Sequence, residues 1–267
     1  MTLELTSKFK EHWAGTPSFD EIMALDGDMY RQVARRKTFK FSLNGHEYFA
    51  KLHKGVGWGE MIKNWLLLRK PVLGAVNEYE AIKALTKLGV KTMTLAAYGQ
   101  QGSNPAELES FVITESLEPA ISLEDLSLTW DKQPPETGLK RALIKRVALI
   151  SAQLHRNGIN HRDLYLCHFL LKQYELATLS DVNDVQLYLI DLHRVQIRAQ
   201  VPRRWQLKDL AALYFSSLEL GLSQRDLLRF IRAYSGCDLR TELAANQRFW
   251  LEVERKALIL KSKPLKD

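Results

Sequence analysis

The sequence has no long hydrophobic run and very little cysteine. No window reaches the roughly 18 consecutive apolar residues of a transmembrane helix, and the first residues, MTLELTSKFKEHW, lack the apolar centre of a signal peptide. The two cysteines, Cys167 and Cys237, are typical of a reducing compartment, where no disulfide is expected. No Cys/His spacing fits structural zinc. We therefore expect a cytoplasmic protein.

Acidic residues are scarce in two basic stretches. Residues 31–54 hold seven Lys and Arg against one acid, Glu47, and residues 194–208 hold five against none. The net charge of the chain is +7. Such patches attract phosphates, anionic lipid, nucleic acid or an acidic protein, although a basic solvated surface has the same composition. No RNA- or DNA-binding motif accompanies the charge, so we expect no nucleic-acid partner.

The first half of the chain alternates between strand and helix signals, without repeats or low-complexity tracts. Residues 35–55 predict a β-hairpin that turns at Asn44-Gly45. Residues 55–74 and 77–89 predict helices, the second with Asn77 as N-cap and Gly89 after its end. Residues 111–117 predict a strand.

The second half is predicted to be mostly helical. The clearest helix covers residues 139–158, and residues 185–195 read as a strand that carries Asp191 at its end. Further helices are expected from Trp205 onwards. This order predicts a two-lobed α+β fold, with a β-rich N-lobe over residues 1–117 and a helical C-lobe over 118–267.

A His-Arg-Asp tripeptide opens the stretch INHRDLYLCHFLL (159–171). Phosphoryl transfer needs a Lys for the nucleotide phosphates, a Glu that holds this Lys, an Asp for the acceptor hydroxyl and an Asp for Mg²⁺. These residue types occur in that order on the expected elements: Lys51, Glu78, Asp163 and Asp191. Each alone has an ordinary alternative, and Glu80 competes with Glu78 for the lysine.

Three features depart from the usual kinase pattern. His168 stands where such loops carry Asn; imidazole is a poor Mg²⁺ ligand, so His168 could contact a phosphate or the metal through water, or be structural. Asp191-Leu192-His193 replaces Asp-Phe-Gly. The segment GVGWG (55–59) follows the Lys51 strand, whereas a phosphate loop should precede it. Basic residues of 31–40 could replace that loop.

The chain resembles the lipopolysaccharide core heptose kinases of Gram-negative bacteria, which have a kinase-like fold. The stretches that carry this resemblance are KLHKG (51–55), RKPVLGAVNEYEAI (69–82), ISLEDL (121–126), INHRDLYLCHFLL (159–171), IDLHRVQIRAQVPRRW (190–205) and KDLAALYFSS (208–217). The resemblance implies transfer of the γ-phosphate of ATP to an inner-core heptose, most simply the first. It also implies ATP and Mg²⁺ as cofactors, and work at the cytoplasmic face of the inner membrane, with peripheral membrane contact.

The resemblance also implies roles for single residues. Asp163 matches the catalytic Asp. His161 and Arg162 are grouped with it from their place in the loop, and we expect His161 to brace the loop because Asp163 is the better-placed base. Lys51 and Glu78 match the nucleotide pair, and Glu115 is included with them. Asp191 matches the metal Asp, with His168 beside it.

Two further segments are candidates for binding the acceptor or a partner. Arg203, Arg204 and Trp205 suit an anionic sugar, because guanidinium groups bind carboxylates and phosphates and indole rings stack on sugars; a surface turn with one core aromatic is an equal alternative. WLLLRKPVLG (65–74) has more consecutive apolar residues than one helix face buries. Core burial is its default interpretation, and an acidic protein partner near Lys63–Lys70 is the other hypothesis.

Two functional alternatives stay open at this point. A kinase-like protein could act on another acceptor, a protein or a small molecule, because the fold does not fix the acceptor. A non-catalytic nucleotide-binding module is the other possibility, favoured by the missing glycine-rich loop and by His168.

Overall fold

The computed structural model describes residues 1–33, 35–55, 74–104, 107–130 and 132–262 of the chain. The chain divides into two compact units. Unit 1 consists of Met1–Ala84, Met93–Leu117 and Leu192–Arg194, and unit 2 of Leu85–Thr92, Glu118–Asp191 and Val195–Asp267. The GVGWG segment beyond Gly55, most of the predicted helix 55–74 and the predicted partner surface near Lys63–Lys70 lie outside the described residues.

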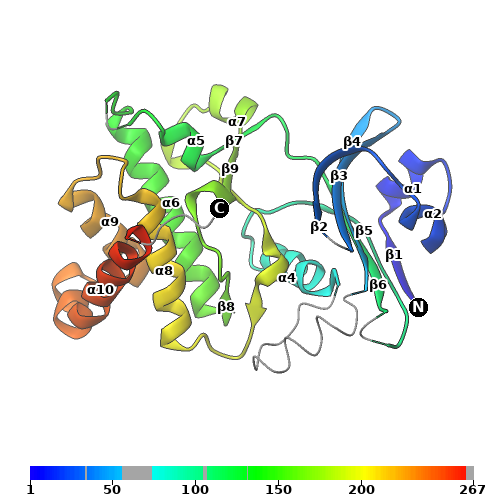
Figure 1. The fold of residues 1–267 in the computed structure, drawn as a ribbon. Helices are drawn as coiled ribbons and strands as arrows, with labels where there is room; N and C mark the ends of the chain where they lie inside the picture. Colours follow the sequence, from blue (N-terminus) through cyan, green and yellow to red (C-terminus); the bar gives the residue numbers. More distant parts are fainter. Residues whose placement is uncertain (34, 56–73, 105–106, 131, 263–267) are drawn as a thin grey trace. The chain divides into compact units, whose positions relative to one another are not determined.

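Unit 1 is built on a six-stranded antiparallel sheet in the order β1-β5-β6-β4-β3-β2 (Figure 1). Its strands are β1 (Thr2–Leu5), β2 (Asp28–Val33), β3 (Arg36–Leu43), β4 (His46–Lys54), β5 (Leu95–Gln101) and β6 (Glu109–Glu115). The predicted hairpin is confirmed as β3–β4, because Asn44 and Gly45 take positive φ angles of 47° and 77° at its turn. β6 confirms the predicted strand 111–117, with earlier bounds.

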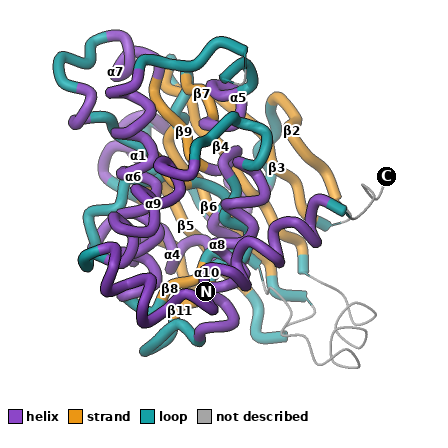
Figure 2. Tube along the Cα trace, turned by 90° about the vertical axis from the view of Figure 1, so that its left-hand side faces the viewer, coloured by secondary structure: helices purple, strands orange, loops and turns teal. Residues whose placement is uncertain are grey.

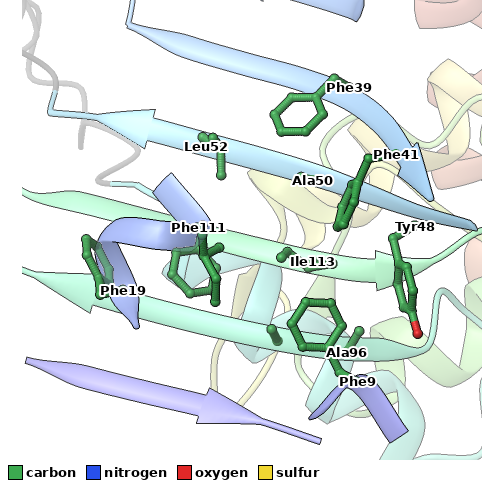
Figure 3. Packing of buried hydrophobic residues seen from close by; sticks show 12 residues of the cluster. Phe9, Phe19, Phe39, Phe41, Tyr48, Ala50, Leu52, Ala96, Phe111 and Ile113 are labelled. Carbon is green, nitrogen blue, oxygen red and sulfur yellow. The ribbon is translucent and has the colours of Figure 1, made fainter. Parts of the chain in front are cut away.

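One face of this sheet forms the core of unit 1. Helices α1 (Ser7–Trp13) and α2 (Phe19–Met23) place Phe9 and Phe19 against it. Every second residue of a strand points its side chain to that face. Figure 3 shows the rings of Phe9 and Phe19 among such side chains, which include Phe41, Leu52 and Phe111. Since neighbouring strand residues point to opposite faces, Lys51, next to Leu52, lies on the other face.

Helix α4 (Val76–Lys87) begins one residue before Asn77. Asn77 therefore lies inside the helix and is not its N-cap, which corrects the prediction. The predicted stop is confirmed: Gly89 follows the helix with φ 73°, a left-handed conformation that glycine adopts without a Cβ clash. This placement puts Glu78 in the first turn of α4.

Unit 2 is mostly helical. Its helices are α5 (Leu123–Ser127), α6 (Thr137–Arg156), α7 (Gln173–Ala177), α8 (Arg203–Ser217), α9 (Gln224–Ser235) and α10 (Leu239–Lys261). Helix α6 packs against α9, and α8 packs against α10 (Figure 2). The predicted helix 139–158 is confirmed as α6, and Gly158, with φ 76°, lies just past its end.

Short strands and turns of unit 2 frame the residues expected to carry chemistry. One sheet joins β7 (Ala120–Ser122), β9 (Phe169–Lys172) and β10 (Tyr188–Leu189), and a pair joins β8 (Ile159–Asn160) and β11 (Gln196–Ile197). The 3₁₀ turns are η1 (Leu166–His168), η2 (Val182–Asp184) and η3 (Leu192–Arg194), the last assigned to unit 1.

The predicted strand 185–195 is too long. Only Tyr188–Leu189 is a strand there, because Asp191 takes φ 59° and the chain then enters η3. Residues 161–163 follow β8 directly, and Asp191 comes two residues after β10. Both expected carboxylates are thus placed on connections at strand ends.

Candidate active site

Lys51 of β4 and Glu78 of α4 form an ion pair in unit 1. The Lys51 Nζ to Glu78 Oε1 distance is 2.6 Å, and only 3% of the Glu78 side chain is exposed. Glu80, the competing candidate, is exposed. The structure therefore brings Lys51 together with Glu78. A buried carboxylate fixes the ammonium group at one place on the sheet, whereas a surface lysine samples many rotamers.

His53 lies near several positive groups beside the Lys51–Glu78 ion pair. It lies two residues after Lys51 on the same face of β4, and it pairs across the sheet with Arg36 of β3. Burial, together with the smaller effects of the charges of Arg36, Lys51 and His193, lowers the pKa of His53 to about 4. His53 is consequently neutral at neutral pH. A face with this potential suits a nucleotide triphosphate.

The sequence analysis did not predict the β2–β3 hairpin, which precedes the β3–β4 hairpin in the chain. β2 pairs with β3, and Val33 and Arg36 are the last paired residues before their connection. Arg35 and Arg36 belong to this region, so the basic residues of 31–40 lie where the sheet has its first hairpin.

Asp209 of α8 fixes the backbone of the loop 161–163. Its side chain is completely buried. Its Oδ2 accepts a hydrogen bond of 2.7 Å from the backbone N–H of His161, and its Oδ1 accepts one of 2.8 Å from that of Arg162. His155 Nε2 lies 3.3 Å from the same Oδ2. Sequence reasoning missed Asp209, although it stands inside the quoted stretch KDLAALYFSS.

These two bonds stabilise an unusual backbone. Arg162 has φ 75°, a left-handed conformation that is unfavourable for a residue with a Cβ by roughly 1–3 kcal/mol. Charge-assisted hydrogen bonds contribute about 1.5–3 kcal/mol each, which is enough to offset that strain. Asp209 therefore fixes the orientation of the residue immediately before Asp163.

His161 braces the loop from its other side. It is fully buried, and its Nε2–H donates to the carbonyl oxygen of Ile190, the residue before Asp191, at 3.0 Å. Burial is the main cause that lowers its pKa, so the ring is neutral at neutral pH. This hydrogen bond connects the loop that carries Asp163 to the segment that carries Asp191. Because the ring is fully buried, it is poorly placed to reach an acceptor.

His168 joins the two expected carboxylate residues directly. Its Nδ1–H donates to the backbone carbonyl of Asp163 at 2.7 Å, and its Nε2 lies 3.4 Å from Asp191 Oδ2. The rings of His168 and His161 are stacked, with centroids 5.8 Å apart. The histidine at the unusual loop position thus connects the backbone of Asp163 to the Asp191 side chain.

The residues around Asp191 fit a magnesium ion that binds together with a nucleotide. Asp191 supplies hard carboxylate oxygens, and 32% of its side chain is exposed. Within the described part of the chain, no cluster of three or more His, Cys, Asp or Glu could enclose a metal by itself. Mg²⁺ is usually held by one or two carboxylates, with phosphate oxygens and water as the other ligands. A single partly exposed carboxylate, that of Asp191, agrees with that pattern.

The three predicted acceptor residues do not form one group, because Arg203 contacts other residues than Arg204 and Trp205 do. The Arg203 guanidinium lies 4.4 Å from the Phe249 ring and donates to Asn246 Oδ1, whereas Arg204 lies 5.9 Å from the Trp205 ring. Glu115, expected at the nucleotide, ends β6 and forms an ion pair with Lys8 at 2.9 Å.

Comparison with known proteins identifies the family. Residues 20–234 match the model of the lipopolysaccharide kinase (Kdo/WaaP) family. The chain belongs to this family. It is 46% identical to the lipopolysaccharide core heptose(I) kinase WaaP of Pseudomonas aeruginosa, over 96% of this chain and 95% of that protein. It is 47% identical to the same kinase of Escherichia coli K12, over 92% and 91%.

A solved structure supports the fold. It is described as WaaP in complex with acyl carrier protein, is 42% identical, and superposes with a TM-score of 0.83 over 97% of this chain and 99% of that one. The predicted kinase-like α+β fold and the predicted family are confirmed. As a Kdo/WaaP kinase, the chain is a phosphotransferase, which implies the use of ATP. None of the described helices combines the length and the apolar character needed to span a bilayer.

Proposed function

We propose that the chain transfers the γ-phosphate of ATP to a hydroxyl group of an inner-core heptose of lipopolysaccharide. The observation that carries this proposal is the nearly full-length identity, 44–47%, to three heptose(I) kinases. The local geometry supports it, because Lys51 pairs with Glu78 and His168 links Asp163 to Asp191.

In unit 1, Lys51 holds the nucleotide phosphates. Glu78 aligns the ammonium group from its buried position in α4. Arg36, across the strand pair from His53, adds positive charge to the same face of the sheet. Side-chain charge here takes the place of a glycine-rich loop. Electrostatic stabilisation of this kind supplies most of the rate gain in phosphoryl transfer.

In unit 2, Asp163 orients the acceptor hydroxyl group and accepts its proton. Asp191 is the metal ligand, and His168 is a positioning residue that orients Asp191 relative to the catalytic loop. When bound, Mg²⁺ neutralises charge on the phosphate oxygens. Asp209 and His161 keep the loop in its strained conformation. Since the acceptor is a glycolipid, we place the reaction at the cytoplasmic face of the inner membrane, with peripheral contact.

The test is transfer of labelled γ-phosphate from ATP to dephosphorylated core lipopolysaccharide in anionic vesicles. Wild type should label the core only with a divalent cation present, and it should sediment with the vesicles. Lys51→Ala should lower kcat/KM for ATP by roughly 10²–10³-fold, because a charge that stabilises the transition state is lost. Lys37→Ala is the matched control, since Lys37 lies on the opposite face of β3 from Arg36.

Unchanged ATP kinetics in Lys51→Ala would mean that another lysine binds the phosphates. Label that goes to protein instead of core would support the alternative acceptor. Folded wild type that binds ATP but transfers nothing would leave only the nucleotide-binding module.

We also propose an acyl carrier protein as a partner, because a 42% identical relative was solved in complex with one. Unit 2 contains an apolar cavity of about 330 Å³ among α5, α6, α8, α9 and α10. Leucines form much of its lining, with Trp130, Phe230 and Trp250. An acyl carrier protein carries an acyl group, whose hydrocarbon tail is apolar like the lining of this cavity. We therefore assign the cavity to that acyl group.

Thermal melting of the chain with acylated and non-acylated carrier protein tests the assignment. The acylated form should raise Tm, since a ligand at about a hundred times its Kd stabilises the folded state by about 2.7 kcal/mol. The non-acylated form should raise it far less. Equal shifts would remove the cavity from the proposal, and the absence of any shift would remove the partner.

A further inference from the structure

Tyr234, in the last turn of α9, is held by its backbone and by its ring. Its backbone carbonyl and that of Ser235 accept hydrogen bonds of 2.8 and 2.7 Å from the guanidinium group of Arg156, at the end of α6. Its ring packs against the rings of Phe230 and Trp250, with centroids 6.1 and 5.6 Å away. These contacts leave the hydroxyl group little freedom of position.

The hydroxyl group of Tyr234 is the first member of a chain of polar contacts. It lies 2.7 Å from Nδ1 of His155 in α6, and Nε2 of the same ring lies 3.3 Å from Oδ2 of Asp209 in α8. Asp209 in turn accepts hydrogen bonds from the backbone N–H groups of His161 and Arg162. The chain of contacts thus runs from α9, through α6 and α8, to the residues just before Asp163.

The hydrogen atoms of this chain can be assigned from its two ends. The carboxylate of Asp209 can only accept, so Nε2 of His155 carries the proton that faces it. In a neutral imidazole the other nitrogen is then an acceptor, and the hydroxyl group of Tyr234 donates to it. Burial raises the pKa of Tyr234, so this hydroxyl group keeps its proton at neutral pH.

This arrangement makes the hydroxyl group decisive for the histidine. With a donor at Nδ1, His155 is fixed in the tautomer that donates to Asp209. Without that donor, the proton would be free to move to Nδ1, and Asp209 would lose its contact with Nε2–H. The orientation of the Asp209 carboxylate matters because it holds the backbone of Arg162 at φ 75°.

We propose that Tyr234 and His155 are positioning residues for phosphate transfer. Tyr234 fixes the tautomer of His155, and His155 orients the carboxylate that holds the loop in front of Asp163. Small displacements of a catalytic group lower the rate of a reaction even when binding is unchanged. The inference rests on the proposed function for the role of Asp163, and it adds two helix residues that the sequence analysis did not single out.

The first test is Tyr234→Phe, which removes the hydroxyl group and keeps the ring between Phe230 and Trp250. It should lower kcat for transfer to the core by roughly threefold to tenfold, the range of one hydrogen bond, and leave KM for ATP and for core unchanged. Tyr174→Phe is the matched control. The exposed Tyr174 hydroxyl group in the same unit donates to Glu175 at 3.2 Å, so its loss should leave kcat unchanged.

The comparison of kcat with Tm separates positioning from a merely structural role. If Tyr234→Phe lowers Tm but keeps the wild-type kcat well below its melting temperature, the hydroxyl group only stabilises the fold, and the inference is overturned. A change of KM for ATP or for core without a change of kcat also overturns it, because Tyr234 would then act on substrate binding.

The second test needs neither ATP nor acceptor. Hydrogen exchange of the backbone amides of His161 and Arg162, which bond to Asp209, should be roughly threefold to tenfold faster in Tyr234→Phe. Tyr174→Phe should exchange at the wild-type rate. Equal rates in Tyr234→Phe and wild type would overturn the inference.

Nitrogen NMR of the His155 ring tests the tautomer itself. Wild type should carry the proton on Nε2 and none on Nδ1, and Tyr234→Phe should populate the Nδ1–H form. A proton on Nδ1 in wild type would overturn the inference. If wild type transfers no phosphate, the proposed function fails, and amide exchange and the tautomer still decide whether Tyr234 positions the loop.

Discussion

Asp163→Ala should lower the rate of phosphate transfer to the core by roughly 10²–10⁴-fold, the usual contribution of a positioned general base. The carboxylate side chain is the part that is removed. The loop backbone is fixed by other residues: Asp209 holds His161 and Arg162, and His168 bonds to the backbone carbonyl of residue 163, which alanine keeps. We therefore expect the melting temperature and ATP binding to change little.

Asp184→Ala is the matched control, because Asp184 is an exposed aspartate in the same unit. It should transfer phosphate at the wild-type rate. His168→Ala in the same assay should also lose rate, since Asp191 loses the ring beside it. A folded Asp163→Ala protein within tenfold of wild type would show that residue 163 does not act on the acceptor hydroxyl, and our assignment of the base would be wrong.

Local signals predicted the parts of the site that depend on neighbours in sequence. Asn44-Gly45 determines the β3–β4 turn because both residues tolerate positive φ. That hairpin, in turn, places Lys51 on the face opposite the Leu52 core. The partner of Lys51 followed from the helix signal, although only the fold could decide between Glu78 and the exposed Glu80.

The parts that sequence missed depend on contacts between distant segments. Asp209 lies 48 residues from His161 along the chain. It stands in a stretch that the sequence predicts only as a helix, and no local pattern says which element a buried carboxylate will contact. The N-terminal elements β1, α1, α2 and β2 were missed as well, because their packing on the sheet decides them more than their propensity does.

Arg203 and Arg204 illustrate the same limit at one position. They are identical residues, adjacent in sequence, and both were predicted to bind the acceptor. Helix geometry separates them: Arg203 meets Phe249 of α10, and Arg204 meets Trp205. The basic composition of residues 194–208 predicted an anion-binding region, but only the helix rotation showed which charges gather there.

Asp209→Asn should be the most damaging substitution outside the reacting groups. The amide has the same shape as the carboxylate but only one acceptor oxygen, whereas Asp209 accepts from two backbone N–H groups and lies beside His155. One N–H group would face an amide NH₂ in a buried site. Breaking such a buried charged network costs about 3–5 kcal/mol, which corresponds to a fall in Tm of about 10 °C for a chain of this size.

The decisive control is Asp226→Asn. Asp226 of α9 is also buried, and hydrogen bonds from Ser223 and Lys140 lower its pKa to about 2 against the opposing effect of burial. Its loss should therefore lower Tm too, but Asp226 makes none of the bonds that hold the loop 161–163. With kcat measured well below both melting temperatures, Asp209→Asn should lose about 10²-fold, comparable to the loss of one oxyanion-stabilising donor, and Asp226→Asn should keep the wild-type value. Equal kcat values in the two variants would reduce Asp209 to a purely structural residue, because Arg162 would then hold its strained backbone without the carboxylate.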